Sequence, residues 1–208
     1  HHAVQVARTQ PAKLAAFEAH YTTSDDPTPL YLMGIPDTKS RTVKYGIAFP
    51  GGVSFLVHND FKTPIKGLDS FPESDWPPVA PVFFAFHLMV ALGGAFLLLT
   101  AAGLFFWWRD SLLENRWLLW LYVLAIPLPF LANEVGWFAA EVGRQPWIVY
   151  GILRTRDAFS EGVSAQQIAG SMIMFTAIYS LLLFLFLFIL ARKVKQGPDP
   201  VEDVADEA

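Results

Sequence analysis

The sequence contains no cysteine, so a disulfide framework and thiolate metal ligands are both excluded. A net charge of −4 provides no basic surface for nucleic acid, and no nucleic-acid partner is expected. The first residue is not methionine, and nothing at the start resembles a signal peptide. We therefore expect a piece of a longer protein, or one half of a split one.

Charged residues are missing from long stretches of the second half of the chain. A helix that crosses a membrane needs about 20 apolar residues, and in lipid its backbone must bond internally. One candidate span contains Glu134 and is interrupted by Pro127 and Pro129, which we expect to kink it. The sequence predicts an all-α integral membrane protein, a bundle of three transmembrane helices at about 79–108, 117–145 and 166–191.

Basic residues in the short connections indicate the orientation of the spans. They follow the first and third spans at Arg109, Arg116, Arg192, Lys193 and Lys195. Because cytoplasmic loops are enriched in Lys and Arg, we expect these ends in the cytoplasm, together with the acidic tail 192–208.

The segment 1–78 then lies outside, as does the loop after the second span. Three arginines in that loop oppose the charge bias, which indicates another role, such as binding an anionic group: Arg144, Arg154 and Arg156.

The outer segment 1–78 reads as mostly irregular, with one short helix starting near Pro11. The stretch 43–49 is compatible with a short strand. A loop of this length is typically functional. Lys13 and Glu18 lie five residues apart, about 140° around a helix, and do not share a face. From spacing alone they are equally compatible with solvated helix charges.

The second span carries a polar stripe. Steps of three and four residues place Glu134, Trp137, Glu141 and Arg144 along one helical face. Placing a carboxylate at membrane depth costs free energy, so such a residue usually binds a cation, pairs with arginine or relays protons. Three readings stay open: an ion pair between Glu141 and Arg144, a metal centre that carries anionic side groups, and a proton path.

The first span contains two possible haem ligands, His87 and Met89, followed by Gly93 and Gly94, where a planar group could approach the backbone. A methionine in an apolar helix is more often core filling. A histidine there could simply bond a neighbouring carbonyl. The residues alone leave both alternatives open.

Two motifs resemble one family. Residues 136–147, GWFAAEVGRQPW, resemble the GWxxxExGRQPW signature of cytochrome bd quinol oxidase subunit I, and residues 10–18, QPAKLAAFE, resemble the QPAKLAAxE motif of the same family. The resemblance covers essentially the whole chain. It implies that residues 1–78 are most of the extracytoplasmic quinol-binding Q-loop, and that residues 79–191 hold the last three of the family's nine spans.

The resemblance also implies residue roles. Lys13 and Glu18 match Q-loop residues associated with quinol binding and oxidation, with Glu18 suited to accept a proton. Met89 matches the axial ligand of the low-spin haem b, whose histidine partner belongs to the missing upstream part. Glu141 matches the acidic ligand of the high-spin haem b.

Further residues match the surroundings of the haems. Trp137 and Arg144 match residues beside the haem pair, with Arg144 suited to propionates. The chain departs from the family at His87, where the family commonly has arginine, and this puts the potential of the low-spin haem in doubt. The third cofactor implied is haem d, or a haem b in its place.

The function implied is that of a quinol oxidase. Quinol is oxidised at the outer face, and oxygen is reduced to water with generation of a proton motive force, in a bacterial or archaeal plasma membrane. The partners implied are the N-terminal half of subunit I, subunit II, a small single-helix subunit and membrane lipids. Two alternatives are a quinol-binding cytochrome b that relays electrons without reducing oxygen, and a haem-free component of a proton or ion transporter.

Overall fold

The computed structural model describes residues 2–160 and 162–197, in two compact units that divide after Ala158. Each unit is described by itself. The elements of the first unit are α1 (His2–Thr9), α2 (Pro11–Phe17), β1 (Leu30–Asp37), β2 (Thr42–Phe49), α3 (Gly52–His58), α4 (Val79–Trp108), α5 (Arg116–Ala125), α6 (Leu128–Val142), β3 (Trp147–Val149) and β4 (Leu153–Arg154). The second unit contains α7 (Ala165–Gln196).

The outer segment is more ordered than the sequence predicts. Strands β1 and β2 form an antiparallel hairpin, paired from Leu30 with Phe49 to Asp37 with Thr42, and α3 follows it. Only the second strand was expected. The missed strand carries Pro36, which a two-stranded sheet tolerates because both strands are edges. The prediction of a mainly helical protein is confirmed, with the hairpin as an addition.

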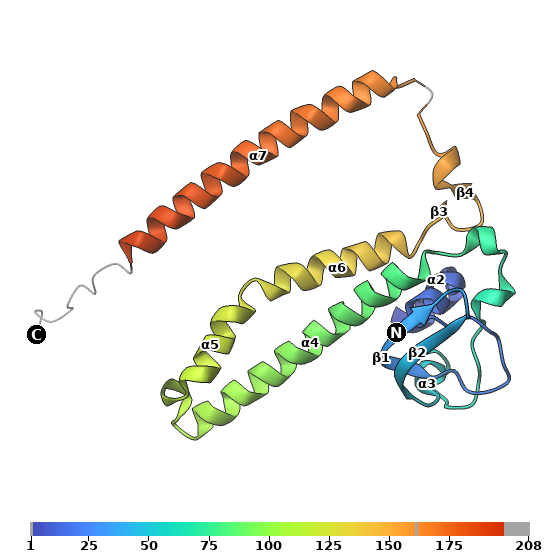
Figure 1. Ribbon diagram of the computed structural model, residues 1–208, viewed down its shortest axis with the longest axis horizontal. Helices are drawn as coiled ribbons and strands as arrows, with labels where there is room; N and C mark the ends of the chain where they lie inside the picture. Colours follow the sequence, from blue (N-terminus) through green and yellow to red (C-terminus); the bar gives the residue numbers. More distant parts are fainter. Residues whose placement is uncertain (1, 161, 198–208) are drawn as a thin grey trace, which may run out of the picture. The chain divides into compact units, whose positions relative to one another are not determined.

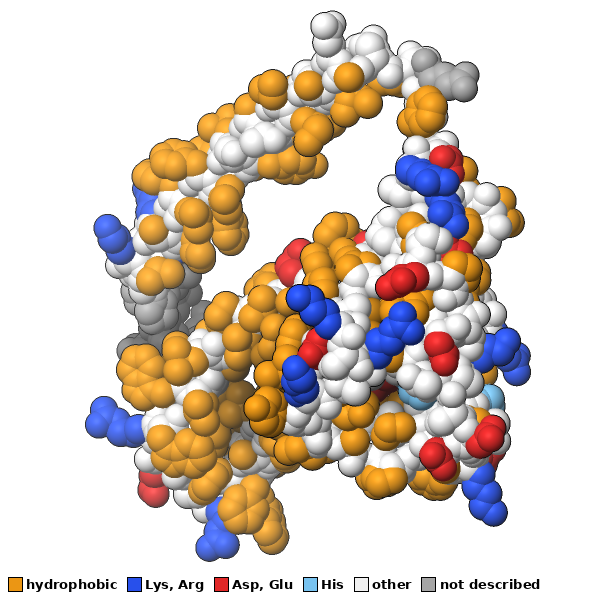
Figure 2. Space-filling view, turned by 45° about the vertical axis from the view of Figure 1, so that its right-hand side comes forward, with side chains coloured by type: hydrophobic (Ala, Val, Ile, Leu, Met, Phe, Trp, Pro, Cys, Tyr) orange, Lys and Arg blue, Asp and Glu red, His pale blue; other side chains and the backbone are white. Residues whose placement is uncertain are grey.

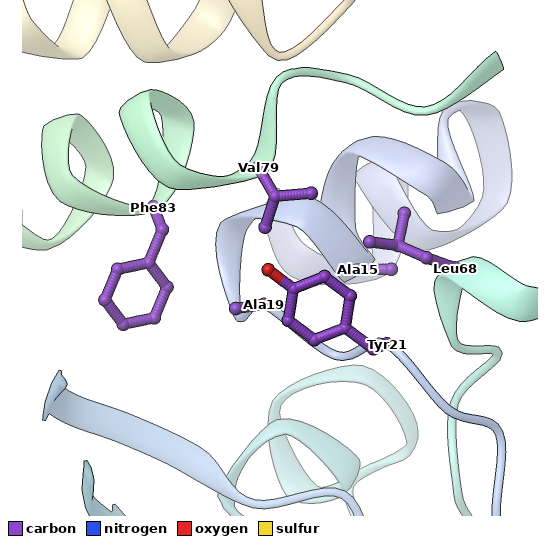
Figure 3. Close-up of a cluster of buried hydrophobic side chains, with 6 residues drawn as sticks. All are labelled: Ala15, Ala19, Tyr21, Leu68, Val79 and Phe83. Atoms are coloured by element: carbon purple, nitrogen blue, oxygen red, sulfur yellow. The ribbon is translucent and has the colours of Figure 1, made fainter. Parts of the chain in front are cut away.

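Helix α4 begins at Val79, directly after two prolines that end the preceding loop. It runs for 30 residues without an Asp, Glu, Lys or Arg side chain. At its N-terminal end it packs against the short helix α2 and the segment after it, through a buried cluster shown in Figure 3 that contains Ala15, Ala19, Tyr21, Leu68, Val79 and Phe83. Segment 1–78 therefore packs directly against helix α4.

Helices α4 and α6 lie side by side, with α2 at their outer end (Figure 1). A second buried cluster joins the three helices through Ala16, Phe17, Val82, Ala85 and Ala139. Most of these side chains are small, so the helix axes approach closely. This contact sets the position of α2 relative to both spans.

The second span is broken as expected. Helices α5 and α6 meet at a bend of 41°, where Pro127 precedes α6 and Pro129 lies in its first turn. The hydroxyl of Tyr122 donates to the carbonyl of Leu99 at 2.9 Å and ties α5 to α4. Within residues 2–160 and 162–197, two helices are long and apolar enough to cross a membrane, and counting the bent pair as one span brings the number to three.

Helix α7 starts with a capping box, in which the Ser164 hydroxyl accepts from the Gln167 amide and the Gln167 side chain accepts from the Ser164 amide. It extends to Gln196, past the expected end at 191, because basic residues such as Lys193 suit the C-terminus of a helix. Apolar side chains run along the length of the long helices (Figure 2). Most of the acidic tail, residues 198–208, lies outside the described residues.

The small-residue contact of α2 yields a stability prediction. Replacing the fully buried Ala16 with leucine adds side-chain volume where α2 meets α4 and α6, and we expect a loss of about 1–3 kcal/mol. Ala48→Leu, on the exposed surface of β2, is the matched control and should change the stability by less than about 0.5 kcal/mol. Thermal unfolding of the purified complex measures both. Equal unfolding midpoints for the two variants would contradict this packing.

Candidate functional site

Glu18 ends helix α2 and is almost completely buried. Its exposure is 3%, and one carboxyl oxygen, Oε2, has no hydrogen-bond partner among the described residues. Burial raises the pKa of Glu18 to about 8, against a smaller opposite effect of the Tyr31 backbone. The carboxyl is therefore mostly neutral at neutral pH. A buried acid with one carboxyl oxygen left without a partner among the described residues is a candidate functional group.

A cavity of about 350 Å³ lies beside Glu18. Its walls come from α1, α2, β1, α3 and α4, and nearly all of its lining is apolar. The rim includes the exposed apolar side chains Leu32, Leu56 and Val90. Glu18 and His87 are among the few polar side chains that reach it. Such a mostly apolar pocket with a few convergent polar groups is the usual form of a small-molecule site.

His87 connects the hairpin to the first span. Its Nδ1 lies 2.8 Å from the carbonyl oxygen of Phe83, and its Nε2 lies 2.8 Å from that of Tyr31 on β1. Both partners are acceptors, and a ring nitrogen that carries a proton can donate to either of them. The ring also stacks on Phe83, with centroids 3.8 Å apart. The bond to a neighbouring carbonyl, one of the two sequence alternatives, is what the structure shows.

Met89 faces helix α6. Its sulfur lies against Gly136 of α6, so close that a Cβ added at Gly136 would come within 2.7 Å of it. Glycine at this position therefore leaves room for the thioether between α4 and α6. Met89 packs between helices here, and its thioether has the chemistry of an axial haem ligand.

Lys13 does not line the cavity that holds Glu18. Its Nζ donates to the carbonyl of Ala140 on α6 at 2.8 Å and lies 5.6 Å from the centre of the Phe17 ring. Burial, and then the charge of Arg144, lower the pKa of Lys13. The helical spacing correctly predicted that Lys13 and Glu18 point to different faces, and the structure does not bring them together.

The polar stripe lies along α6 and just beyond its end. Glu141 forms an ion pair with Arg144, and their side chains are 43% and 32% exposed. The pair is therefore only partly covered by the rest of the described chain. Trp137 is 63% exposed on the same helix, and Glu134 is also exposed. The structure thus shows the ion pair expected as one alternative, and it leaves the carboxylate and the indole on an open surface.

Arg154, in the loop after α6, forms an ion pair with an acidic residue of this chain. Its guanidinium pairs with Asp75, just before α4, and lies 4.8 Å from the centre of the Trp147 ring. For Arg154, the anionic partner is therefore a residue of this chain. No sequence pattern pointed to Asp75, because the two partners are 79 residues apart.

The residues present suit a haem better than a bare ion. Among the described residues, no cluster of three or more His, Asp or Glu side chains could hold a metal ion. One thioether on α4 and one carboxylate on α6 match the way a haem iron takes single axial ligands from different helices. The open surface with Trp137, Glu141 and Arg144 offers an aromatic ring, a carboxylate and a guanidinium to a planar anionic group.

These features define a mainly helical integral membrane protein with a mostly apolar pocket beside a buried carboxyl, and with a thioether and a carboxylate on its apolar helices. The sequence model described as cytochrome bd terminal oxidase subunit I matches residues 1–198. The chain belongs to this family.

Individual relatives agree with that assignment. The chain is 32% identical over 206 residues to cytochrome bd ubiquinol oxidase subunit 1 of Bacillus subtilis, covering 95% of this chain and 44% of the relative. It is 26% identical to cytochrome bd-II ubiquinol oxidase subunit 1 of Escherichia coli, covering 96% of this chain and 51% of that protein. The solved bd oxidase of Geobacillus thermodenitrificans matches with a TM-score of 0.75 and 32% identity, over 94% of this chain and 44% of that one. The chain thus spans about half the length of its curated relatives.

The buried acid makes stability depend on pH. Because the pKa of Glu18 rises from 4.5 to about 8 on folding, its contribution is complete below about pH 4.5 and is lost as the pH rises to about 8. Glu18→Gln removes this dependence. We expect the variant's advantage in unfolding temperature to widen from pH 5 to 8 and to level off above that, in thermal scans of the purified complex. A constant difference would mean that Glu18 is not desolvated.

Proposed function

We propose that this chain forms the quinol-oxidising segment and part of the haem-binding membrane core of a cytochrome bd-type quinol oxidase. The observation that carries the proposal is the buried carboxyl of Glu18 at an apolar cavity, with one oxygen, Oε2, that has no partner among the described residues. A quinol headgroup is a flat ring with two hydroxyl groups, so it needs mainly apolar walls and a few polar contacts. The apolar rim suits entry of a lipid-soluble substrate from the membrane.

The chemistry at Glu18 is proton transfer. Oxidation of quinol releases two electrons and two protons, and an ionised carboxylate within hydrogen-bond reach of a quinol hydroxyl can accept one of the protons. Phe17 and Phe86, stacked with ring centroids 4.5 Å apart, form apolar wall beside it. Because the pKa of Glu18 is raised to about 8, only a minor fraction is ionised at neutral pH.

The membrane part would hold the haems. Met89 would bind the low-spin haem b and Glu141 the high-spin haem b, with Trp137 and Arg144 beside them. The haems supply the one-electron chemistry and the reduction of oxygen when they are bound. The residues of this chain hold and orient these groups, and Arg144 balances negative charge near Glu141.

The rest of the enzyme would come from elsewhere. We propose that the N-terminal half of subunit I supplies the remaining haem ligands, including those of haem d or a third haem b, and that subunit II and a small single-helix subunit complete the complex. In the proposed bacterial plasma membrane, segment 1–78 is extracytoplasmic and the C-terminal end cytoplasmic. Oxidation of quinol outside, with oxygen reduction fed by cytoplasmic protons, then generates a proton motive force.

Glu18→Gln tests the site in the assembled complex. Removing the proton acceptor should lower kcat for quinol oxidation by about 10²- to 10⁴-fold. In the unchanged protein, kcat should rise with pH up to about 8, where the carboxyl becomes ionised, and this rise should vanish in the variant. Quinol-dependent oxygen uptake between pH 6 and 9 measures both, and it also separates an oxidase from an electron relay. Normal turnover of Glu18→Gln would contradict the proposal.

The two haem assignments are tested by optical spectra. Glu141→Ala should remove or weaken the signal of the high-spin haem, and Met89→Leu should disturb the reduced spectrum of the low-spin haem. Glu134→Ala, which removes an exposed acid from the same helix, is the matched control and should leave the spectra unaltered. Full haem content with normal spectra in Glu141→Ala would exclude it as a ligand.

A further inference from the structure

Lys13 belongs to the motif associated with quinol, yet its side chain points away from the cavity. It reaches across to α6 and donates to the carbonyl of Ala140, 127 residues later in the chain. We propose that Lys13 is a positioning residue, which closes the outer end of α6 and fixes α2 against it, and that it does not contact quinol. This inference rests on the proposed function only in taking the cavity beside Glu18 as the place where quinol binds.

The end of α6 has a carbonyl that needs a partner. The last four carbonyls of a helix lack intrahelical partners. In a continuing helix the amide of Arg144 would bond the carbonyl of Ala140, but it bonds that of Glu141 instead, at 3.3 Å. The amides of Gly143 and Gln145 bond Ala139 and Val142. The Ala140 carbonyl takes its hydrogen bond from Lys13.

Lys13 also suits this place electrostatically. The C-terminus of a helix carries partial negative charge, and a lysine that bonds its last carbonyls stabilises it. The side chain is half-buried, so solvent screens this contact less than it would screen one on an open surface. The Phe17 ring, 5.6 Å from Nζ, adds a second favourable contact.

The contact joins the two halves of the candidate site. Ala140 directly precedes Glu141, the proposed ligand of the high-spin haem b, while Lys13 shares its helix with the residues that lead to Glu18. A shift of α2 would therefore move Glu141, and a shift at the end of α6 would change the shape of the cavity. Loss of Lys13 should disturb both Glu141 and the cavity, although Lys13 contacts neither of them.

The test compares Lys13→Met and Lys13→Arg in the assembled complex. Hydrogen–deuterium exchange is measured on a peptide covering residues 139–147, and the spectrum of the high-spin haem is recorded beside it. Lys13→Met should speed exchange of the amides of residues 143–145 by about two- to tenfold, the effect of one lost hydrogen bond, and should alter that haem spectrum. Lys13→Arg keeps a donor and should restore both. Lys62→Met, an exposed lysine of the outer segment, is the matched control.

A direct role in quinol binding predicts another pattern. Lys13→Met would then raise the KM for quinol while the exchange rates and the haem spectrum stay unchanged, and that result would overturn the proposal. If Lys13→Met does not assemble, Lys13→Leu, which also lacks a donor, gives the same comparison. Exchange does not depend on turnover, so a complex that fails to oxidise quinol would refute the proposed function without deciding the role of Lys13.

Discussion

The contact of the short helix α2 with the two long helices α4 and α6 is the constraint on which both candidate sites depend. Ala15 and Ala16 are fully buried, and Phe17 packs with them against α4. Once this helix is seated, its period decides where the remaining side chains point. Glu18 reaches the cavity and Lys13 reaches the end of α6. One packing contact therefore directs the carboxyl at the end of this short helix and the lysine within it to different surroundings.

Burial acts differently on the acids of the chain. Glu18 is closed off by protein, so desolvation keeps it mostly neutral, and a neutral buried carboxyl costs far less than a charged one. Glu141 is nearly half exposed and paired with Arg144. The surroundings of the first acid are thus supplied by this chain, whereas the second acid lies on an open surface of it.

The parts of the fold that could be predicted are those set by local pattern. The absence of charge defined α4 and α7, and two prolines defined the bend between α5 and α6. The helical period separated Lys13 from Glu18. The hairpin was only half predicted, because β1 contains Gly34 and Pro36 and gains its order from pairing with β2. The cavity could not be predicted at all, since β1, which forms one wall, lies 56 residues from His87 where it bonds α4.

His87 holds the hairpin against the first long helix. Its ring nitrogens meet two carbonyl oxygens, one in its own helix and one on β1. Met89 follows two residues later, about 200° around the helix, and faces α6. One turn of α4 therefore presents His87 to the cavity beside Glu18 and Met89 to the neighbouring helix. The hydrogen bond of His87 to β1 keeps the cavity wall formed by the hairpin in contact with α4.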